Sequence, residues 1–515
     1  MRAGALNARR RSSELDRLAG GEAVDIAVVG GGVTGAGIAL DAAARGLSVA
    51  LVEAHDLAFG TSRWSSKLVH GGLRYLAKGQ FALAYESAVE RGILMTSTAP
   101  HLTRTIPQVF PMHDTTSRAQ QAVIATGLHA GDLLRRAART PSRVLPGPRR
   151  IPRAEAMALA PGLHGTGLRG ALLSFDGALT DDARLVLALA RTAASLGARV
   201  FTALPATEVA ADGVWVKDRL TGHALRINAR QVVNATGVWA GELVPSARLT
   251  PSRGSHLVLP LSATGLGVSA VMVPVPGATN RFVLLLPQPN GRVYLGLTDE
   301  PVSGAIPDVP DVPESDVDFL LEVASSALRR DLSRDDVIGR FAGLRPLIGE
   351  PGDETLSADR SREHAVLTSP DGVVTVIGGK LTTYRKMAAE AVDKAIATAG
   401  LRAGPSPTRN LPLLGAASRS ALTTVEAPRR LVATYGTEAA SVRAIGDLDP
   451  ALAEPLYPGC DITGAEVVWA VRQEGALDVD DVLHRRTRLG LVPAEADAAR
   501  ERAADLVERT LAGLA

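Results

Sequence analysis

The sequence predicts an α/β domain of the Rossmann type, an antiparallel β-sheet inserted into that domain, and a C-terminal α-helical domain. Three patterns predict this fold class. They are a glycine-rich turn between an apolar strand and a helix near the start of the chain, short apolar runs separated by turns at residues 255–298, and helical periodicity beyond residue 405. A chain of 515 residues is too long for one hydrophobic core, so two or three domains are expected.

The composition limits the classes of function. The 56 basic residues nearly balance the 54 acidic residues, so the charge gives no indication of nucleic-acid binding. Cys460 is the only cysteine, which excludes an intramolecular disulfide and a thiolate metal site, and no metal is expected. No run of about eighteen apolar residues is present, so we expect a cytoplasmic protein that is at most peripherally associated with the cytoplasmic membrane. Residues 1–22 are rich in arginine and lack an apolar core, which predicts a disordered or weakly helical leader rather than a signal peptide.

The first predicted element is an apolar, β-branched run at residues 23–29, typical of a buried parallel strand. It leads into Gly30-Gly31-Gly32-Val33-Thr34-Gly35, and a helix of small residues is predicted at about 36–45. A second apolar strand at 48–52 is followed by Glu53. The glycine motif alone is weak evidence in a chain with 51 glycines, but the complete strand–turn–helix–strand–acid pattern predicts a dinucleotide site.

Each motif residue has a mechanical role in such a site. Gly30 permits the tight turn, Gly32 lets the backbone approach a pyrophosphate, and Gly35 lets the helix pack closely on the strand. The free N–H groups at the helix start then face the phosphates. Glu53 is placed to accept hydrogen bonds from a ribose, and an acid at this position argues against the 2′-phosphate of NADP.

Two later segments could complete the site. A strand at residues 230–233 runs into a small turn that contains Gly237, which suits a second close approach to the cofactor. Residues 373–377 predict a third strand, followed by Gly378-Gly379-Lys380-Leu381-Thr382 and a helix at 384–398. The start of this helix could hold the negative charge of a reduced flavin. On spacing alone, an ordinary strand–turn–helix of an α/β sheet is an equal alternative.

The most specific signal is the segment Thr61-Ser62-Arg63-Trp64-Ser65-Ser66-Lys67-Leu68-Val69-His70-Gly71-Gly72-Leu73-Arg74-Tyr75-Leu76. It resembles the signature of the flavin-linked glycerol-3-phosphate dehydrogenases, within the D-amino-acid-oxidase-like flavoproteins. Other stretches similar to this family follow in the same order, at residues 181–186, 234–239, 254–256, 343–347, 378–386 and 484–490. The resemblance covers about residues 24–510.

The resemblance implies FAD bound without a covalent link, in an FAD-binding domain at residues 23–404. A substrate-covering antiparallel sheet is expected within it at about 76–175 and 250–345, and a helical domain at 405–515. The implied reaction is oxidation of sn-glycerol 3-phosphate to dihydroxyacetone phosphate by hydride transfer to FAD. Electrons would pass to a quinone at the inner membrane surface, and the oligomeric state, a homodimer included, is left open. The cofactor-binding residues expected are Gly30, Gly32, Gly35, Glu53, Thr61, Ser62, Ser66, Lys67, Leu68, Gly237, Gly379, Leu381 and Thr382.

The substrate requires two kinds of side chain. Its phosphate dianion needs permanent positive charges, ideally with a phenol nearby, and the resemblance points to Arg74, Tyr75 and Lys380. Its secondary alcohol must lose a proton, for which a neutral imidazole is the usual base near pH 7. His70, inside the signature segment, is the first candidate. His256 is the second, and Arg345 is expected to help electrostatically.

Three alternatives remain open. A glycerol-3-phosphate oxidase would share the fold and the substrate but pass its electrons to oxygen, and the additional insertion typical of such oxidases is not seen here. An amino-acid oxidase of the same fold would need a cation for a carboxylate and would gain nothing from three cations and a phenol. A non-catalytic FAD-binding protein would neither bind the substrate nor reduce its flavin with it.

Overall fold

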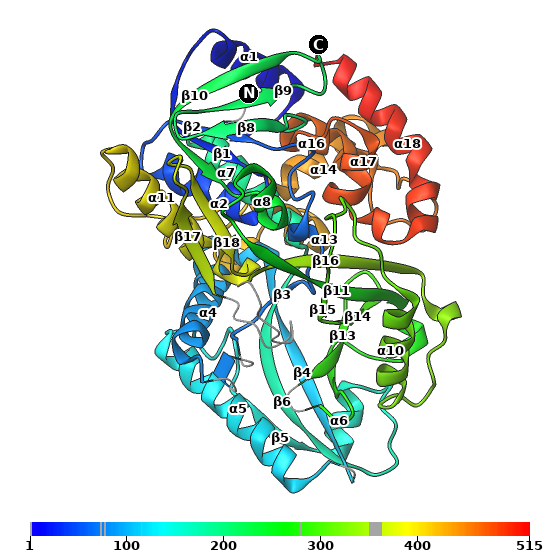
Figure 1. Ribbon diagram of the computed structural model, residues 1–515. Helices are drawn as coiled ribbons and strands as arrows, with labels where there is room; N and C mark the ends of the chain where they lie inside the picture. Colours follow the sequence, from blue (N-terminus) through cyan, green and yellow to red (C-terminus); the bar gives the residue numbers. More distant parts are fainter. Residues whose placement is uncertain are drawn as a thin grey trace.

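The protein has two β-sheets, one above the other in Figure 1, with the C-terminal helices packed beside the upper sheet. The computed structural model describes residues 3–72, 75–76, 79–114, 116–278, 281–349 and 363–514. The upper sheet is mainly parallel and the lower sheet mainly antiparallel, and the chain passes between them several times. The predicted fold class is confirmed.

The upper sheet has the strand order β17-β18-β10-β1-β2-β7, and β8 and β9 are joined to it through β10. Its strands are β1 (Val24–Val29), β2 (Val49–Val52), β7 (Arg199–Phe201), β8 (Ala206–Ala210), β9 (Gly213–Lys217), β10 (Ala224–Asn234), β17 (His364–Thr368) and β18 (Val374–Gly378). The chain adds β2 and β7 on one side of β1, and then β10 and β18 on the other side, all parallel to it. The strand order therefore reverses between β1 and β10. In open α/β sheets, ligands bind at such a point, outside the carboxyl ends of the strands.

Helices cover one face of the upper sheet. These are α2 (Val33–Ala44), α7 (Asp182–Ser195) and α11 (Tyr384–Ala399), whose alanine-rich and leucine-rich faces share a buried core with β1 and β2. The α2 helix begins three residues earlier than the sequence predicts, because the side chain of Ser62 accepts a hydrogen bond from the Val33 N–H at its first turn. The opposite face is covered by β8, β9 and α8 (Ala240–Leu243), over a second buried core.

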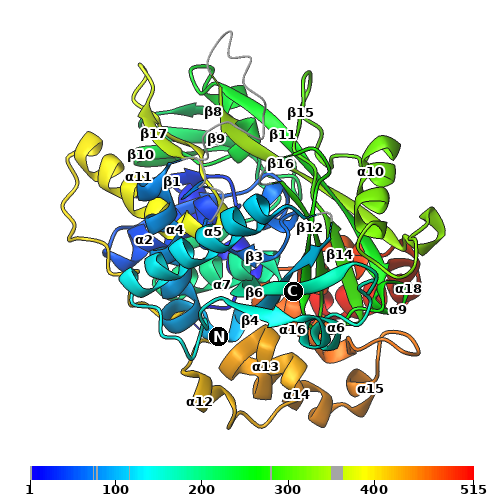
Figure 2. The ribbon, with the colours of Figure 1, turned by 90° about the horizontal axis from the view of Figure 1, so that it is seen from below.

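The lower sheet contains β3 (Leu68–Val69), β4 (Thr103–His113), β5 (Arg149–Pro152), β6 (Leu168–Leu179), β11 (Leu249–Pro260), β12 (Ala270–Pro274), β13 (Phe282–Pro287), β14 (Arg292–Gly296), β15 (Glu300–Pro301) and β16 (Gly339–Ile348). In the described part of the chain its pairs are antiparallel, apart from β4 with β12. One face packs against α6 (Arg153–Leu159) and α10 (Glu314–Ser325). The helices α4 (Phe81–Ile93) and α5 (Arg118–Ala137) lie side by side at one edge of the molecule (Figures 1 and 2).

Beyond residue 405 the chain forms a helical domain. Its α-helices are α12 (Arg419–Leu422), α13 (Arg429–Tyr435), α14 (Ala439–Leu448), α15 (Pro450–Ala453), α16 (Gly464–Glu474), α17 (Val479–Asp481) and α18 (Pro493–Ala512). The helices α16 and α18 share a small core of their own. The domain boundaries predicted from the sequence, 23–404 and 405–515, remain a proposal.

The N-terminal segment corrects part of one expectation, because residues 1–22 were predicted to form a disordered or weakly helical leader. The described residues include the helix α1 (Ala8–Ala19), which starts at a side-chain cap on Asn7. Leu15 and Leu18 are buried in the core beside the upper sheet. The Arg11 guanidinium lies 2.6 Å from the Asp218 carboxylate, in a buried ion pair. The prediction of disorder is wrong, because contacts with residues about two hundred positions away hold the helix in place.

Buried neutral histidines predict how stability depends on pH. Burial lowers the pKa of both His101 and His256 to about 3, so the folded protein keeps these rings neutral while the unfolded chain protonates them below about pH 6.5. The unfolded state therefore binds more protons, and stability falls as pH drops from about 6.5. Each ring contributes a slope of up to about 1.4 kcal/mol per pH unit.

Thermal or urea unfolding between pH 7.5 and 5.5 measures this slope. We expect His101→Gln to reduce it by the amount that one histidine contributes, whereas replacement of the exposed His223 by Gln leaves it unchanged. A slope that is identical in His101→Gln and the wild type would contradict the assignment.

Candidate active site

A cavity of about 1100 Å³ lies between the two sheets. Its lining includes residues at the carboxyl ends of β1, β2, β10 and β18, where the strand order reverses, and residues of β11, β13 and β16 from the lower sheet. Pockets for single small molecules usually measure about 300–1000 Å³. The cavity therefore has room for a dinucleotide together with a small substrate.

The glycine-rich turn after β1 forms one wall of the cavity. Gly30 has a φ of 109°, and a Cβ at this position would lie 2.6 Å from the Ala235 carbonyl oxygen. A Cβ on Gly35 would lie 1.8 Å from the Gly30 carbonyl oxygen, so the helix could not pack against the turn. Gly32 is the N-cap of α2 and lines the cavity. The turn thus leaves space above the positive end of α2, where a pyrophosphate fits.

Two side chains hold this turn in place. The Glu53 carboxylate accepts hydrogen bonds from the Gly31 N–H, at 2.6 Å, and from the His55 N–H, at 2.9 Å. Burial raises the pKa of Glu53, against the effect of these two bonds. Ser62 caps α2, and Thr61 donates from its Oγ1 to the Leu344 carbonyl oxygen at 2.6 Å. Glu53, Thr61 and Ser62 all line the cavity, as predicted for residues that hold a cofactor.

The second and third predicted turns reach the same cavity. Gly237 follows β10 with a φ of 62°, and Gly379 follows β18 with a φ of 80°. A Cβ on Gly379 would lie 2.5 Å from the Met387 sulfur, so the Met387 side chain would have to move, and the positive φ itself disfavours a larger residue. Leu381 and Thr382 continue this wall toward α11. The dinucleotide residues predicted from three distant segments therefore meet around one space.

Lys67 is an exception among the predicted cofactor residues. Its neighbours Ser66 and Leu68 line the cavity, but Lys67 does not. The Lys67 ammonium donates to the Asp182 carboxylate and to the Arg63 carbonyl oxygen, both at 2.8 Å. Burial lowers its pKa to about 8, although Asp182 favours the charged form. This buried ion pair directs the Lys67 side chain away from the cavity, so any contribution of Lys67 to cofactor binding would come from its backbone, which lies between two cavity-lining residues.

Two of the three predicted phosphate-binding residues, Tyr75 and Lys380, line the cavity close to His70. The Lys380 ammonium lies 4.0 Å from the centroid of the Tyr75 ring and donates to Ser87 Oγ at 2.6 Å. The His70 ring lies 6.2 Å from the Tyr75 ring, measured between centroids. His70, Tyr75 and Lys380 all line the cavity. Arg74 lies outside the described residues.

The lower sheet contributes His256 from β11 and Arg345 from β16. The His256 Nε2 lies 2.8 Å from Ser66 Oγ, and its ring stacks on Phe341 with centroids 4.7 Å apart. The Arg345 guanidinium lies 3.1 Å from the Asp299 carboxylate and donates to the Thr298 carbonyl oxygen. His256 and Arg345 both line the cavity, so the structure brings together every described residue that was predicted to act on the substrate.

The sequence did not reveal Asp176, a buried residue of β6 that also lines the cavity. Its carboxylate accepts a hydrogen bond from Arg91, at 2.6 Å, and one from the Gly71 N–H, at 3.3 Å. Asp176 thereby fixes the loop that carries His70. No local motif marks this residue, because its partners lie 85 and 105 positions away. In the described part of the chain, no group of three or more His, Cys, Asp or Glu side chains could hold a metal ion.

Comparison with known proteins agrees with this geometry. Residues 25–385 match the family described as FAD dependent oxidoreductase, and residues 406–512 match the C-terminal domain of alpha-glycerophosphate oxidase. Glycerol-3-phosphate dehydrogenase 1 of Mycobacterium tuberculosis is 52% identical over 496 residues, which cover 95% of this chain and 96% of that protein. The mitochondrial glycerol-3-phosphate dehydrogenase of Rattus norvegicus is 32% identical, over 94% of this chain and 70% of that protein.

A solved structure resembles the whole chain. It is the glycerol-3-phosphate dehydrogenase from Bacillus halodurans complexed with FAD, with a TM-score of 0.72 and 26% identity, covering 98% of this chain and 97% of that one. The chain belongs to the glycerol-3-phosphate dehydrogenase family of FAD-dependent oxidoreductases.

Proposed function

We propose that the protein oxidises sn-glycerol 3-phosphate to dihydroxyacetone phosphate, with FAD as the hydride acceptor and a quinone as the next electron acceptor. The observation that carries this proposal is the continuity of the cavity. One cavity is lined both by the glycine-rich turn at the start of α2 and by Lys380, His70 and Arg345. When bound, FAD supplies the two-electron acceptor that takes a hydride from the middle carbon.

The phosphate of the substrate fits the end of the cavity near Lys380. Its ammonium group is held between the face of Tyr75 and the hydroxyl of Ser87, which fixes its position before the substrate arrives. Arg74 is the second proposed phosphate ligand from the sequence. A fixed cation in a partly apolar cavity favours a dianion over an uncharged alcohol, so glycerol itself should bind poorly.

Arg345 is proposed to stabilise charge on the oxygen of the middle carbon. Asp299 and Thr298 hold the guanidinium through contacts of 3.1 Å each, so it needs little rearrangement during the reaction. It belongs to the lower sheet, which covers the cavity and helps to exclude water from it.

His70 remains our first candidate for the base. The pKa of His256, lowered to about 3 by burial and by the charges of Lys67 and Arg345, makes that ring a weak base at neutral pH. The Nδ1 atom of His70 accepts the Gly72 N–H over 3.2 Å, which places the proton of the neutral ring on Nε2. In this tautomer the free lone pair of the ring is on Nδ1, so the substrate hydroxyl would have to replace the Gly72 N–H there in order to pass its proton to His70.

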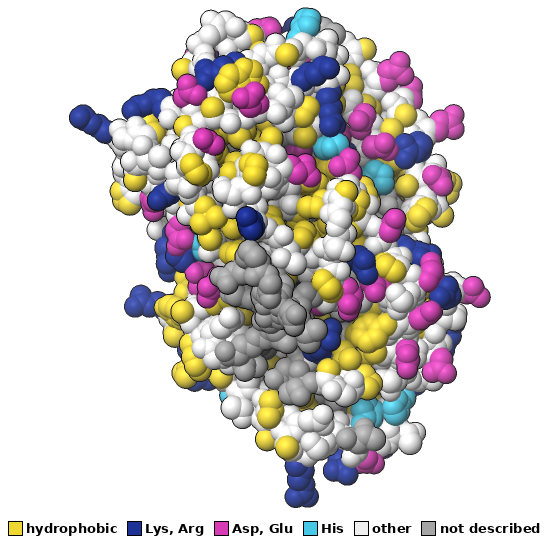
Figure 3. Space-filling model, in the orientation of Figure 1, with side chains coloured by type: hydrophobic (Ala, Val, Ile, Leu, Met, Phe, Trp, Pro, Cys, Tyr) yellow, Lys and Arg dark blue, Asp and Glu magenta, His cyan; other side chains and the backbone are white. Residues whose placement is uncertain are grey.

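The entrance of the cavity supports a lipophilic electron acceptor. Phe81 on α4 is 65% exposed and Val123 on α5 is 51% exposed, and both line the cavity. Hydrophobic side chains also reach the surface at the edge of the molecule where these helices lie (Figure 3). In the described residues, no helix is both long and apolar enough to cross a membrane. We propose that a quinone reaches the flavin through this entrance while the protein is attached peripherally to the cytoplasmic membrane.

Anaerobic titration of the FAD-loaded protein tests the proposed reaction. We expect glycerol 3-phosphate to bleach the flavin absorbance band and glycerol to leave it unchanged, because only the former carries the dianion that Lys380 would hold. A flavin that stays oxidised in the presence of glycerol 3-phosphate would leave a non-catalytic FAD-binding protein as the better description.

Re-oxidation of the bleached flavin then distinguishes the acceptors. We expect a quinone analogue to restore the absorbance band much faster than air does. Rapid recovery in air with production of hydrogen peroxide would instead identify a glycerol-3-phosphate oxidase.

Two variants test the base. His70→Asn should retain FAD and reduce the anaerobic rate of flavin reduction by about 10²–10⁴-fold, the usual contribution of a general base. His256→Asn should have a smaller effect, because the burial that keeps its ring neutral also makes it a poor proton acceptor. If the His256 variant is the slower one, the ranking is reversed, and if both reduce FAD at the wild-type rate, neither ring is the base.

A further inference from the structure

We infer that the basic turn of the C-terminal domain, residues 484–488, sets the affinity for FAD by holding the two loops that carry the cofactor-binding side chains. The inference rests on the proposed binding of FAD in the cavity. Residues 484–490 resemble the corresponding part of the family, but the resemblance assigns no role to them. None of its five residues lines the cavity, so any effect on FAD must act through the loops.

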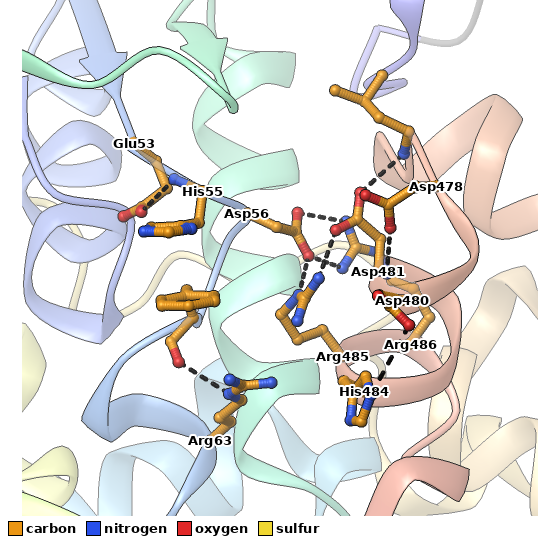
Figure 4. A network of polar contacts seen from close by, with 12 residues as sticks. Glu53, His55, Asp56, Arg63, Asp478, Asp480, Asp481, His484, Arg485 and Arg486 are labelled. Carbon is orange, nitrogen blue, oxygen red and sulfur yellow. Dashed lines mark hydrogen bonds and ion pairs between the residues drawn. The ribbon is translucent and has the colours of Figure 1, made fainter. Parts of the chain in front are cut away.

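The first loop follows β2 and begins with Glu53. Three residues further on, the Asp56 carboxylate accepts hydrogen bonds from Arg485 and Arg486 of the turn (Figure 4). Arg485 Nε donates to Asp56 Oδ2 at 2.5 Å, and Arg486 donates to both carboxylate oxygens, at 2.7 and 2.8 Å. Arg486 also donates to the Glu474 carbonyl oxygen at the end of α16, at 2.9 Å. The loop is thus tied to the framework of the C-terminal domain.

The same loop is tied to the glycine-rich turn at two points. The Glu53 carboxylate accepts the Gly31 N–H, and the Ala58 N–H donates to the Gly31 carbonyl oxygen at 3.0 Å. Asp56 lies between these two points in the sequence. Its two arginine partners therefore fix the segment between Glu53 and Ala58, whose two ends bind the glycine-rich turn at Gly31.

The second loop carries Ser62 and Ser66, and the turn reaches it through Arg488. Arg488 Nη2 donates to the Arg63 carbonyl oxygen at 2.5 Å, and Arg488 Nε lies 3.0 Å from the Asp181 carboxylate. Lys67 donates to the same carbonyl oxygen. Two cations that do not line the cavity therefore hold the backbone between two residues that do.

These contacts are buried and charged, which makes them rigid and sensitive to substitution. Asp56 is 2% exposed and Arg486 is 3% exposed. Burial would raise the pKa of the Asp56 carboxyl, but Arg486 and Arg485 outweigh this effect and hold it below its ordinary value. Without Arg486, Arg485 alone would serve the buried carboxylates of Asp56 and Asp481, so their negative charge would be only partly balanced and the Asp56 loop would be drawn toward water. A displaced loop would carry Glu53 away from Gly31.

FAD affinity and folding stability must be separated, because the turn also joins two domains. The matched control is the ion pair between Arg191 on α7 and Glu438 in the C-terminal domain, with contacts of 2.7 and 2.9 Å. It connects the same domains through a similar two-pronged contact, but neither residue lines the cavity. A purely structural role for residues 484–488 predicts the same behaviour for both pairs.

The experiment compares Arg486→Gln with Glu438→Gln. The FAD dissociation constant of each is measured by reconstituting apoprotein and following the quenching of flavin fluorescence, and thermal unfolding of each is measured without FAD. We expect Arg486→Gln to weaken FAD binding by about tenfold or more, the scale on which residues that orient binding groups act. We expect Glu438→Gln to lower the unfolding temperature while its FAD affinity stays within about twofold of wild type.

Equal FAD affinity in Arg486→Gln and the wild type, or an equal loss of affinity in the two variants, would overturn the inference. If Arg486→Gln does not fold, Arg486→Lys retains the charge and loses the two-pronged contact, and it should weaken FAD binding without abolishing it. The outcome is independent of the substrate. A protein that binds FAD tightly but is not bleached by glycerol 3-phosphate would contradict the proposed function and leave this inference intact.

Discussion

The parallel pairing of β1 with β10 brings two turns with little side-chain bulk to the same edge of the upper sheet. Val29 and Asn234 lie opposite each other, so Gly30 and Ala235 follow at the same level. A Cβ on Gly30 could not fit beside the Ala235 carbonyl oxygen, and this close approach leaves the start of α2 open toward the cavity. If this pairing shifted by one residue, Gly30 would no longer lie beside Ala235, and the turns after β1 and β10 would not meet.

The charged groups of the site depend on a second constraint, which is that each is held by a partner before any ligand binds. Arg345 is fixed by Asp299, Lys380 contacts Ser87, and Asp176 with Arg91 fixes the loop that carries His70. In a mostly apolar cavity such groups interact strongly with a bound dianion, because little solvent has to rearrange. The arginines of residues 484–488 act one step further from the ligands: they hold the loops that carry Glu53, Ser62 and Ser66.

The sequence predicted the parts of the fold that local physics determines. Apolar runs and glycine positions identified β1, the turn after it, and Glu53, because these features depend on residues close together in the chain. The resemblance to a family then assigned roles to His70, Lys380 and Arg345, which spacing alone could not do.

What the sequence could not predict depends on contacts between distant segments. The N-terminal helix is ordered because Arg11 reaches Asp218, and α2 starts early because Ser62 caps it. The Lys67 side chain points away from the cavity because its ammonium group forms an ion pair with Asp182, more than a hundred residues later in the chain. No periodicity or motif reports such pairs, so they become visible only in three dimensions.

A crystal structure of the protein with FAD and glycerol 3-phosphate, prepared without oxygen and any electron acceptor, tests the central claim most directly. We expect the pyrophosphate of FAD at the start of α2, the substrate phosphate beside Lys380, and the middle carbon between the flavin ring and His70. A substrate phosphate bound away from Lys380, or a dinucleotide bound outside the cavity between the two sheets, would contradict it.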